Sequence, residues 1–143
     1  MKIVFLDIDG VLNYEGCEIE HPLGHTGVDP EKVELLNQLL ERTGAKVVIS
    51  STWRKHYTRK ELTEYLESQG FRGEVIGFTP VHRGIRSFRG DEVGSWLSEH
   101  PEITHHVILD DDGDFHADQP LIQTDCMVGL TRENIDEAVR RLS

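Results

Sequence analysis

The chain has 143 residues, with 29% charged and 37% hydrophobic side chains and a formal net charge of −11 at pH 7. This acidic balance argues against tight non-specific binding to nucleic acid or to anionic membranes. The apolar runs are too short for a membrane span, and the N-terminus lacks the features of a signal peptide. The two cysteines make no disulfide framework. We therefore expect a single cytoplasmic domain over residues 1–143.

The first predicted element is a strand over residues 3–6, because this short run is entirely apolar. Asp7 and Asp9 follow it directly, and Gly10 comes next. Two neighbouring carboxylates that lose water repel each other and need a cation or a proton. The end of this strand is therefore a candidate site for a hard metal ion.

A long irregular segment is predicted over residues 13–28, which contain four glycines and prolines. A loop of this length in a compact domain is usually functional, and we interpret it as a flap over the site. Asp29 and Pro30 then have the pattern of a helix start, and Gly44 that of a helix end. The remaining expected elements are strand 46–49, helix 58–68, strand 74–78, helix 90–99, strand 106–109, strand 121–123 and helix 131–142.

Alternating strands and helices predict an α/β fold of three layers, Rossmann-like, with a central, mostly parallel sheet. Ligands bind beyond the carboxyl ends of the strands in such sheets. Three predicted strands end in polar residues, which are Asp7 and Asp9, Ser50 and Ser51, and the acidic run 110–114. We expect these clusters to converge, and their carboxylates suit Mg²⁺ rather than zinc, since no Cys/His set has zinc spacing.

This set of residues fits phosphoryl transfer. A carboxylate can attack phosphorus and form an aspartyl-phosphate, and a second carboxylate two residues away can move protons. Ser50 offers a hydroxyl for the transferring oxygens. The required cation would come from the segment before the last acidic run, which contains Arg83, Arg86 and Arg89.

The order of these motifs resembles the haloacid dehalogenase (HAD) superfamily of aspartate-nucleophile phosphatases. Residues 5–12 (FLDIDGVL) are similar to its first motif, residues 47–50 (VVIS) to its second, and residues 107–111 (VILDD) to its fourth, which also occurs as DxxxD and would then include Asp114. Residues 50–54, 89–93 and 109–111 look most like a group of small HAD domains, some of them fused to RNA-repair enzymes.

The resemblance implies a role for each matched residue. Asp7 would be the nucleophile and a metal ligand, and Asp9 the general acid/base, with its carbonyl on Mg²⁺. Ser50 would bind the phosphoryl group. For the cation of the family's third motif we favour Arg89, with Arg86 next, because Arg89 directly precedes the helix that leads into the last acidic strand. Asp110 would bind the metal directly, with Asp111 or Asp114 completing the shell. The implied substrate-binding residues are Gly10, Ser51 and Arg54.

The same resemblance implies a Mg²⁺-dependent phosphomonoester hydrolase with a minimal cap or none, because the segment after the first motif is short. An open site suits a large substrate, and the likeness favours a nucleotide or a nucleic-acid end. The alternatives are a nucleotidase or phosphotransferase selective for small nucleotides, and a catalytically idle binding or interaction domain.

Several residues also have simpler interpretations. The acidic run 110–114 has the composition of a charged turn, and Ser50 to Thr52 that of a helix cap. Trp53 and Phe115 could stack on a base, although aromatic residues more commonly fill a core. Of the eight histidines, we expect surface or core roles, with His21, His25 and His116 the ones that could reach the mouth of the site.

Overall fold

The computed structural model describes residues 1–82 and 88–143. Its centre is an all-parallel sheet of five strands in the order β3-β2-β1-β4-β5. The strands are β1 (Lys2–Leu6), β2 (Lys46–Ile49), β3 (Val75–Phe78), β4 (His105–Asp110) and β5 (Leu121–Gln123). The predicted α/β class and sheet are therefore confirmed.

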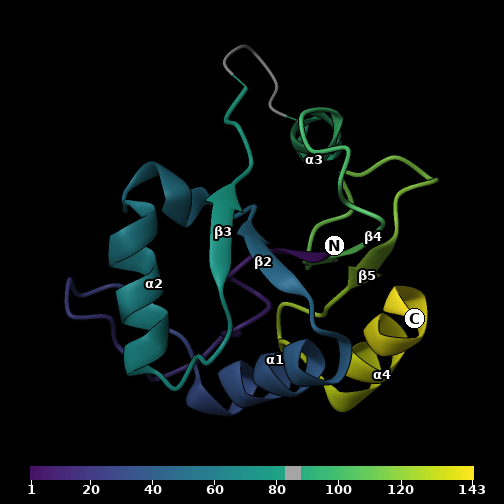
Figure 1. The fold of residues 1–143 in the computed structure, drawn as a ribbon. Coiled ribbons are helices and arrows are strands. Elements are labelled where there is room, and N and C mark those ends of the chain that lie inside the picture. The colour runs from purple at the N-terminus through teal and green to yellow at the C-terminus, as the bar shows by residue number, and fades with distance from the viewer. Residues whose placement is uncertain (83–87) are drawn as a thin grey trace.

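In the described part of the chain, four α-helices flank the sheet (Figure 1): α1 (Pro30–Thr43), α2 (Arg59–Ser68), α3 (Arg89–Ser98) and α4 (Arg132–Leu142). The predicted start and end of α1 are confirmed, because the side chain of Asp29 caps the helix and Gly44 ends it in the left-handed conformation. Thr58 and Glu61 form the predicted capping box of α2. One short element was not predicted, the 3₁₀ helix η1 (Thr52–Lys55).

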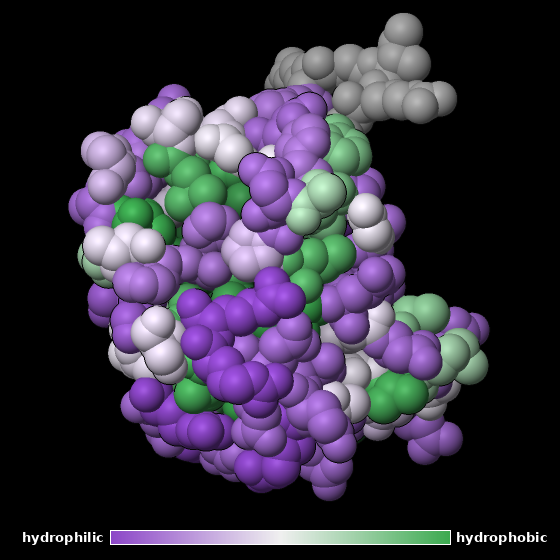
Figure 2. Space-filling model, turned by 90° about the vertical axis from the view of Figure 1, so that its right-hand side faces the viewer, coloured by the Kyte–Doolittle hydropathy of each residue, from purple (hydrophilic) through white to green (hydrophobic). Residues whose placement is uncertain are grey.

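The sheet is buried on both faces, because successive residues of β1 point to opposite sides. Val4 and Leu6 belong to the larger core, which α1, α2 and α4 complete. Ile3 and Phe5 belong to a second core, which Val93 and Trp96 of α3 complete. This explains the continuous apolar runs in the strands. The face drawn in Figure 2 is mostly hydrophilic, and its apolar side chains form separate areas.

The segment over residues 13–28, which we call the flap, has no helix or strand, and a single bridge pairs Glu20 with Thr26. Within the described ranges no additional cap domain accompanies the sheet and its four helices. No helix among the described residues has both the length and the apolar character needed to cross a bilayer.

Candidate active site

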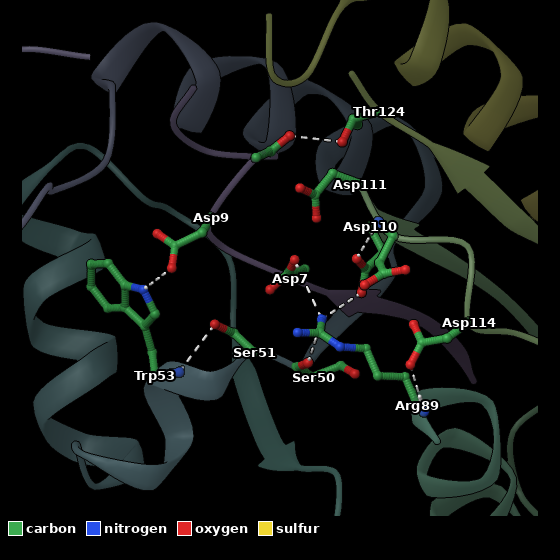
Figure 3. Close-up of polar contacts among 12 residues, drawn as sticks. Asp7, Asp9, Ser50, Ser51, Trp53, Arg89, Asp110, Asp111, Asp114 and Thr124 are labelled. Atoms are coloured by element: carbon green, nitrogen blue, oxygen red, sulfur yellow. Dashed lines mark hydrogen bonds and ion pairs between the residues drawn. The ribbon is translucent and has the colours of Figure 1, made fainter. Parts of the chain in front are cut away.

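The carboxyl ends of β1, β2 and β4 bring three of the expected residues together. Leu6 lies opposite both Ile49 and Leu109 in the sheet register, so the residues after these positions are neighbours. The backbone bonds continue past the strands, since Asp7 N–H donates to Leu109 O (3.0 Å) and Ser50 N–H donates to Leu6 O (2.9 Å). The predicted convergence of Asp7, Ser50 and Asp110 is thus observed (Figure 3).

Three carboxylates form a cluster that could hold a metal ion. Asp7, Asp110 and Asp111 each offer one oxygen, and these oxygens lie within 4.8 Å of one another. Asp7 is 3% exposed and Asp110 is fully buried. Hard oxygen ligands at this separation fit Mg²⁺, which keeps several waters beside a few carboxylates. Asp111, rather than Asp114, is the third member of this cluster.

The electrostatics of the cluster favour a cation as well. Burial, reinforced by the Asp110 carboxylate, raises the pKa of Asp7 to about 8, although Arg89 opposes the shift. Burial also raises the pKa of Asp110 to about 6, again against the effect of Arg89. Carboxyl groups in this environment hold protons unless positive charge is close by. Additional positive charge at this point would keep both groups ionised.

Arg89 supplies one positive charge from the first turn of α3. Its Nη1 atom lies 2.7 Å from Asp110 Oδ2 and 3.4 Å from Asp7 Oδ2, and its side chain is 20% exposed. It therefore reaches the point at which the three strands end. Arg83 and Arg86, the other candidate cations, lie outside the described residues.

Asp114 lies beside Arg89 and binds backbone N–H groups in the first turn of α3. Its Oδ2 accepts a hydrogen bond from the Arg89 backbone N–H (3.2 Å), and its carbonyl accepts one from Gly90 N–H (3.1 Å). Its other oxygen, Oδ1, is buried without a hydrogen-bond partner among the described residues, and so is the hydroxyl of Ser50. Buried polar atoms normally have partners, so both atoms are available to an incoming polar group.

Asp9 occupies a different environment, although it is only two residues from Asp7. Its side chain is exposed and points away from Asp7 (Figure 3). Asn13 Nδ2 donates to Asp9 Oδ1 (2.9 Å), and Trp53 Nε1 donates to Asp9 Oδ2 (3.1 Å). Two neutral N–H groups, one from the flap and one from η1, thus fix the carboxylate.

Position 10 requires a glycine for steric reasons. Its φ is +82°, and a Cβ at this position would collide with the carboxylate of Asp111. Its N–H donates to Asn13 Oδ1 (2.9 Å), and its carbonyl accepts from the Thr124 hydroxyl (2.7 Å). Gly10 therefore permits the close approach of Asp111, and it holds the turn after β1.

Arg54 and Ser51 have structural partners that the sequence did not reveal. Arg54 donates to Glu92 Oε1 (3.0 Å), Thr79 O (3.1 Å) and Ser51 O (2.6 Å), and its side chain is only 4% exposed. Arg54 is therefore held in a buried ion pair with Glu92, and its expected contact with substrate stays a prediction. The Ser51 hydroxyl accepts from Trp53 N–H (3.1 Å) and caps η1, in line with the simpler interpretation.

Sequence reasoning did not assign Asn13 or Thr124 to the site. Asn13 is almost buried and binds Asp9, Gly10 and the Gly27 carbonyl (2.9 Å). An asparagine four residues after Asp9 was the available signal. Thr124 directly follows β5, and a polar residue directly after a strand was the pattern that could have assigned it to the site. His116 pairs with Asp91 of α3 (2.7 Å), whereas His25 lines a pocket beside Asp9.

Comparison with known families agrees with this geometry. A sequence model described as the HAD domain in Swiss Army Knife RNA repair proteins matches residues 3–135, a range that contains every residue of the candidate site. A search of curated proteins finds no significant match.

Proposed function

Because the chain belongs to the family of HAD domains in Swiss Army Knife RNA repair proteins, we propose that it is a Mg²⁺-dependent phosphatase that removes a terminal phosphate from a nucleic-acid end. The observation that carries the proposal is the buried cluster of Asp7, Asp110 and Asp111, with the Arg89 guanidinium beside it. The family description supports the choice of substrate, and one domain over residues 1–143 would contain the whole site.

In the proposed reaction Asp7 is the nucleophile. One of its carboxylate oxygens attacks phosphorus, the bond from phosphorus to the ester oxygen breaks, and Asp9 donates a proton to that leaving oxygen. Water then attacks the phosphorus of the aspartyl-phosphate while Asp9 takes the proton back. Inorganic phosphate leaves, and Asp7 is restored.

The remaining residues hold charge and position oxygens. Arg89 and the Ser50 hydroxyl, which has no partner among the described residues, would bind the transferring oxygens. Asp7, Asp110 and Asp111 would hold Mg²⁺, with the Asp9 carbonyl and Asp114 as further oxygen groups. When bound, Mg²⁺ supplies charge that offsets the repulsion between Asp7 and a phosphate dianion. Gly10 and Ser51 would shape the backbone around the phosphate.

The test is phosphate release from an aryl phosphate and from 5′- and 3′-phosphorylated oligonucleotides, with Mg²⁺ or with a chelator. We expect Mg²⁺-dependent release that Asp7→Asn abolishes without loss of the fold. Activity that Asp7→Asn leaves intact would refute the mechanism, and no release from any substrate would favour an idle binding domain. Selective hydrolysis of mononucleotides would identify a nucleotidase.

A further inference from the structure

A pocket of about 420 Å³ opens beside Asp9. Trp53 forms its buried floor, and its walls come from the flap and from η1 and the residues after it. Besides Asp9 and Trp53, the lining residues are His25, Thr26, Thr52, His56 and Tyr57. We propose that this pocket binds the nucleobase of the end residue whose phosphate is removed. The inference rests on the proposed function and deepens it.

The position of Asp9 determines where the leaving group lies. A general acid must be within hydrogen-bond reach of the oxygen that it protonates, so the rest of the substrate extends on the side of Asp9. The Asp9 carboxylate points toward Trp53, whereas Asp7 and Arg89 lie on the other side of it (Figure 3). The aromatic pocket is therefore the space next to the leaving oxygen.

The lining of the pocket fits a flat and uncharged group. Within the described part of the chain, no lysine or arginine lines it, so a further phosphate would find no counter-charge there. Aromatic rings stack on any base, because every base has a π-face. Hydroxyls of Thr26 and Thr52 add hydrogen-bonding groups for the edge of a base.

The walls are held in place before any ligand binds. His25 stacks on the buried His21, with ring centroids 4.3 Å apart, and meets Trp53 edge to face at 4.8 Å. Its Nε2 atom lies 2.5 Å from the Tyr57 hydroxyl, and its Nδ1 atom lies 2.8 Å from the Thr26 carbonyl. A preorganised wall binds with less entropy loss than a mobile one.

A second hollow beside Asp9 is a poorer candidate. It has a volume of about 230 Å³, and its lining includes the carboxylates of Asp9, Glu15 and Asp111. This concentration of negative charge would repel the anionic backbone of a nucleic acid. The aromatic pocket is larger and holds a single carboxylate, that of Asp9.

The experiment compares single-stranded oligonucleotides whose terminal phosphate is carried by an ordinary residue or by an abasic one. We expect the protein to prefer the base-bearing end by about tenfold or more in kcat/KM, as stacking of one base predicts. His25→Ala and Tyr57→Ala should each lower this ratio severalfold. His105→Ala is the matched control, because His105 is an exposed histidine at the start of β4, at the opposite end of the strands.

Equal hydrolysis of the two ends by the unmodified protein would overturn the inference and leave the proposed function standing. An unchanged ratio in both pocket variants would also overturn it, as would a stronger preference for a phosphotyrosine peptide. If no substrate is hydrolysed, the proposed function fails, and binding of the same two oligonucleotides to Asp7→Asn decides the inference separately. Tighter binding of the base-bearing end would support the pocket, and equal binding would refute it.

Discussion

Asp7 and Asp9 are two residues apart, yet the regions around them differ in almost every physical respect. Asp7 is buried among charges, next to Asp110 and the Arg89 guanidinium. Asp9 is exposed, and neutral N–H groups of Asn13 and Trp53 hold it beside an aromatic pocket. Under the proposed function this difference would be a division of labour, with the nucleophile and the metal on the Asp7 side and the leaving group with its base on the Asp9 side.

After the loss of activity expected for Asp7→Asn, the largest effect is expected on the same side, from Arg89→Ala. We expect kcat/KM for a phosphomonoester to fall by about 10²–10³, the usual cost of removing one group that stabilises charge in a transition state. Arg42→Ala is the control, because Arg42 forms an exposed ion pair with Asp136 and should leave the rate unchanged. Equal rates for the two variants would show that Arg89 does not contact the phosphoryl group.

The pH dependence of stability tests the charge environment of Asp7 directly. The raised folded-state pKa values of about 8 and about 6 mean that the folded protein binds protons that the unfolded chain has lost above about pH 4. Without divalent ions, the free energy of unfolding should therefore fall between about pH 4 and pH 8, by on the order of a few kcal/mol. Chemical denaturation across this range measures it.

Adding Mg²⁺ and substituting Asp7 both test whether this pH dependence of stability comes from the carboxylate cluster. Mg²⁺ should raise the melting temperature more at pH 8 than at pH 5, because protons compete with the ion for the same oxygens. Asp7→Asn should flatten the pH dependence, whereas Asp136→Asn at the exposed pair should not. A melting temperature that Mg²⁺ raises equally at both pH values would contradict the assignment of the cluster.

A smaller effect is expected at Gly10, which lies between the two regions. Gly10→Ala places a Cβ at a residue with positive φ, which strains the backbone, and it also displaces the Asp111 carboxylate. Gly16→Ala is the matched control, since Gly16 has a similar φ of +84° and nothing within 4 Å of an added Cβ. We expect Gly10→Ala to destabilise the protein by about 1–3 kcal/mol more than Gly16→Ala. It should also weaken Mg²⁺ binding, and equal unfolding energies would contradict this explanation.

The smallest effect is expected on the Asp9 side, from Trp53→Phe. This change removes the N–H that binds Asp9 Oδ2 but keeps an aromatic ring on the floor of the pocket. We expect kcat to fall severalfold, the value of one hydrogen bond that orients the acid/base group. Trp96→Phe, in the core on the opposite face of the sheet, controls for general loss of packing, and an equal drop in both variants would argue against the orienting role.

The fold and the Asp7 side were predictable from the sequence for a simple reason. Apolar runs identify buried parallel strands, and strand ends in a parallel sheet lie at one edge, so Asp7, Ser50 and Asp110 could be placed together without coordinates. The Asp9 side was not predictable in this way. Its bonds to Asn13 and Trp53 depend on the path of the flap and on η1, a short 3₁₀ helix with no strong sequence pattern.

Long-range packing also decided the partners of charged residues near the site. Arg54 follows the second motif closely, yet its partner Glu92 is 38 residues away and lies in α3. Asp111 and Asp114 both fit the fourth motif, and the direction of the turn after β4 places Asp111 in the carboxylate cluster and Asp114 at the start of α3. Neither outcome follows from residue spacing.

The most direct test of the divided roles is to trap the aspartyl-phosphate. The protein is quenched during turnover of an aryl phosphate and reduced with borohydride, which converts a phosphorylated aspartate to homoserine, and the peptide over residues 3–12 is sequenced by mass spectrometry. We predict homoserine at position 7 with Asp9 unchanged, and none in Asp7→Asn. Conversion at position 9, or at another carboxylate with Asp7 intact, would contradict the account.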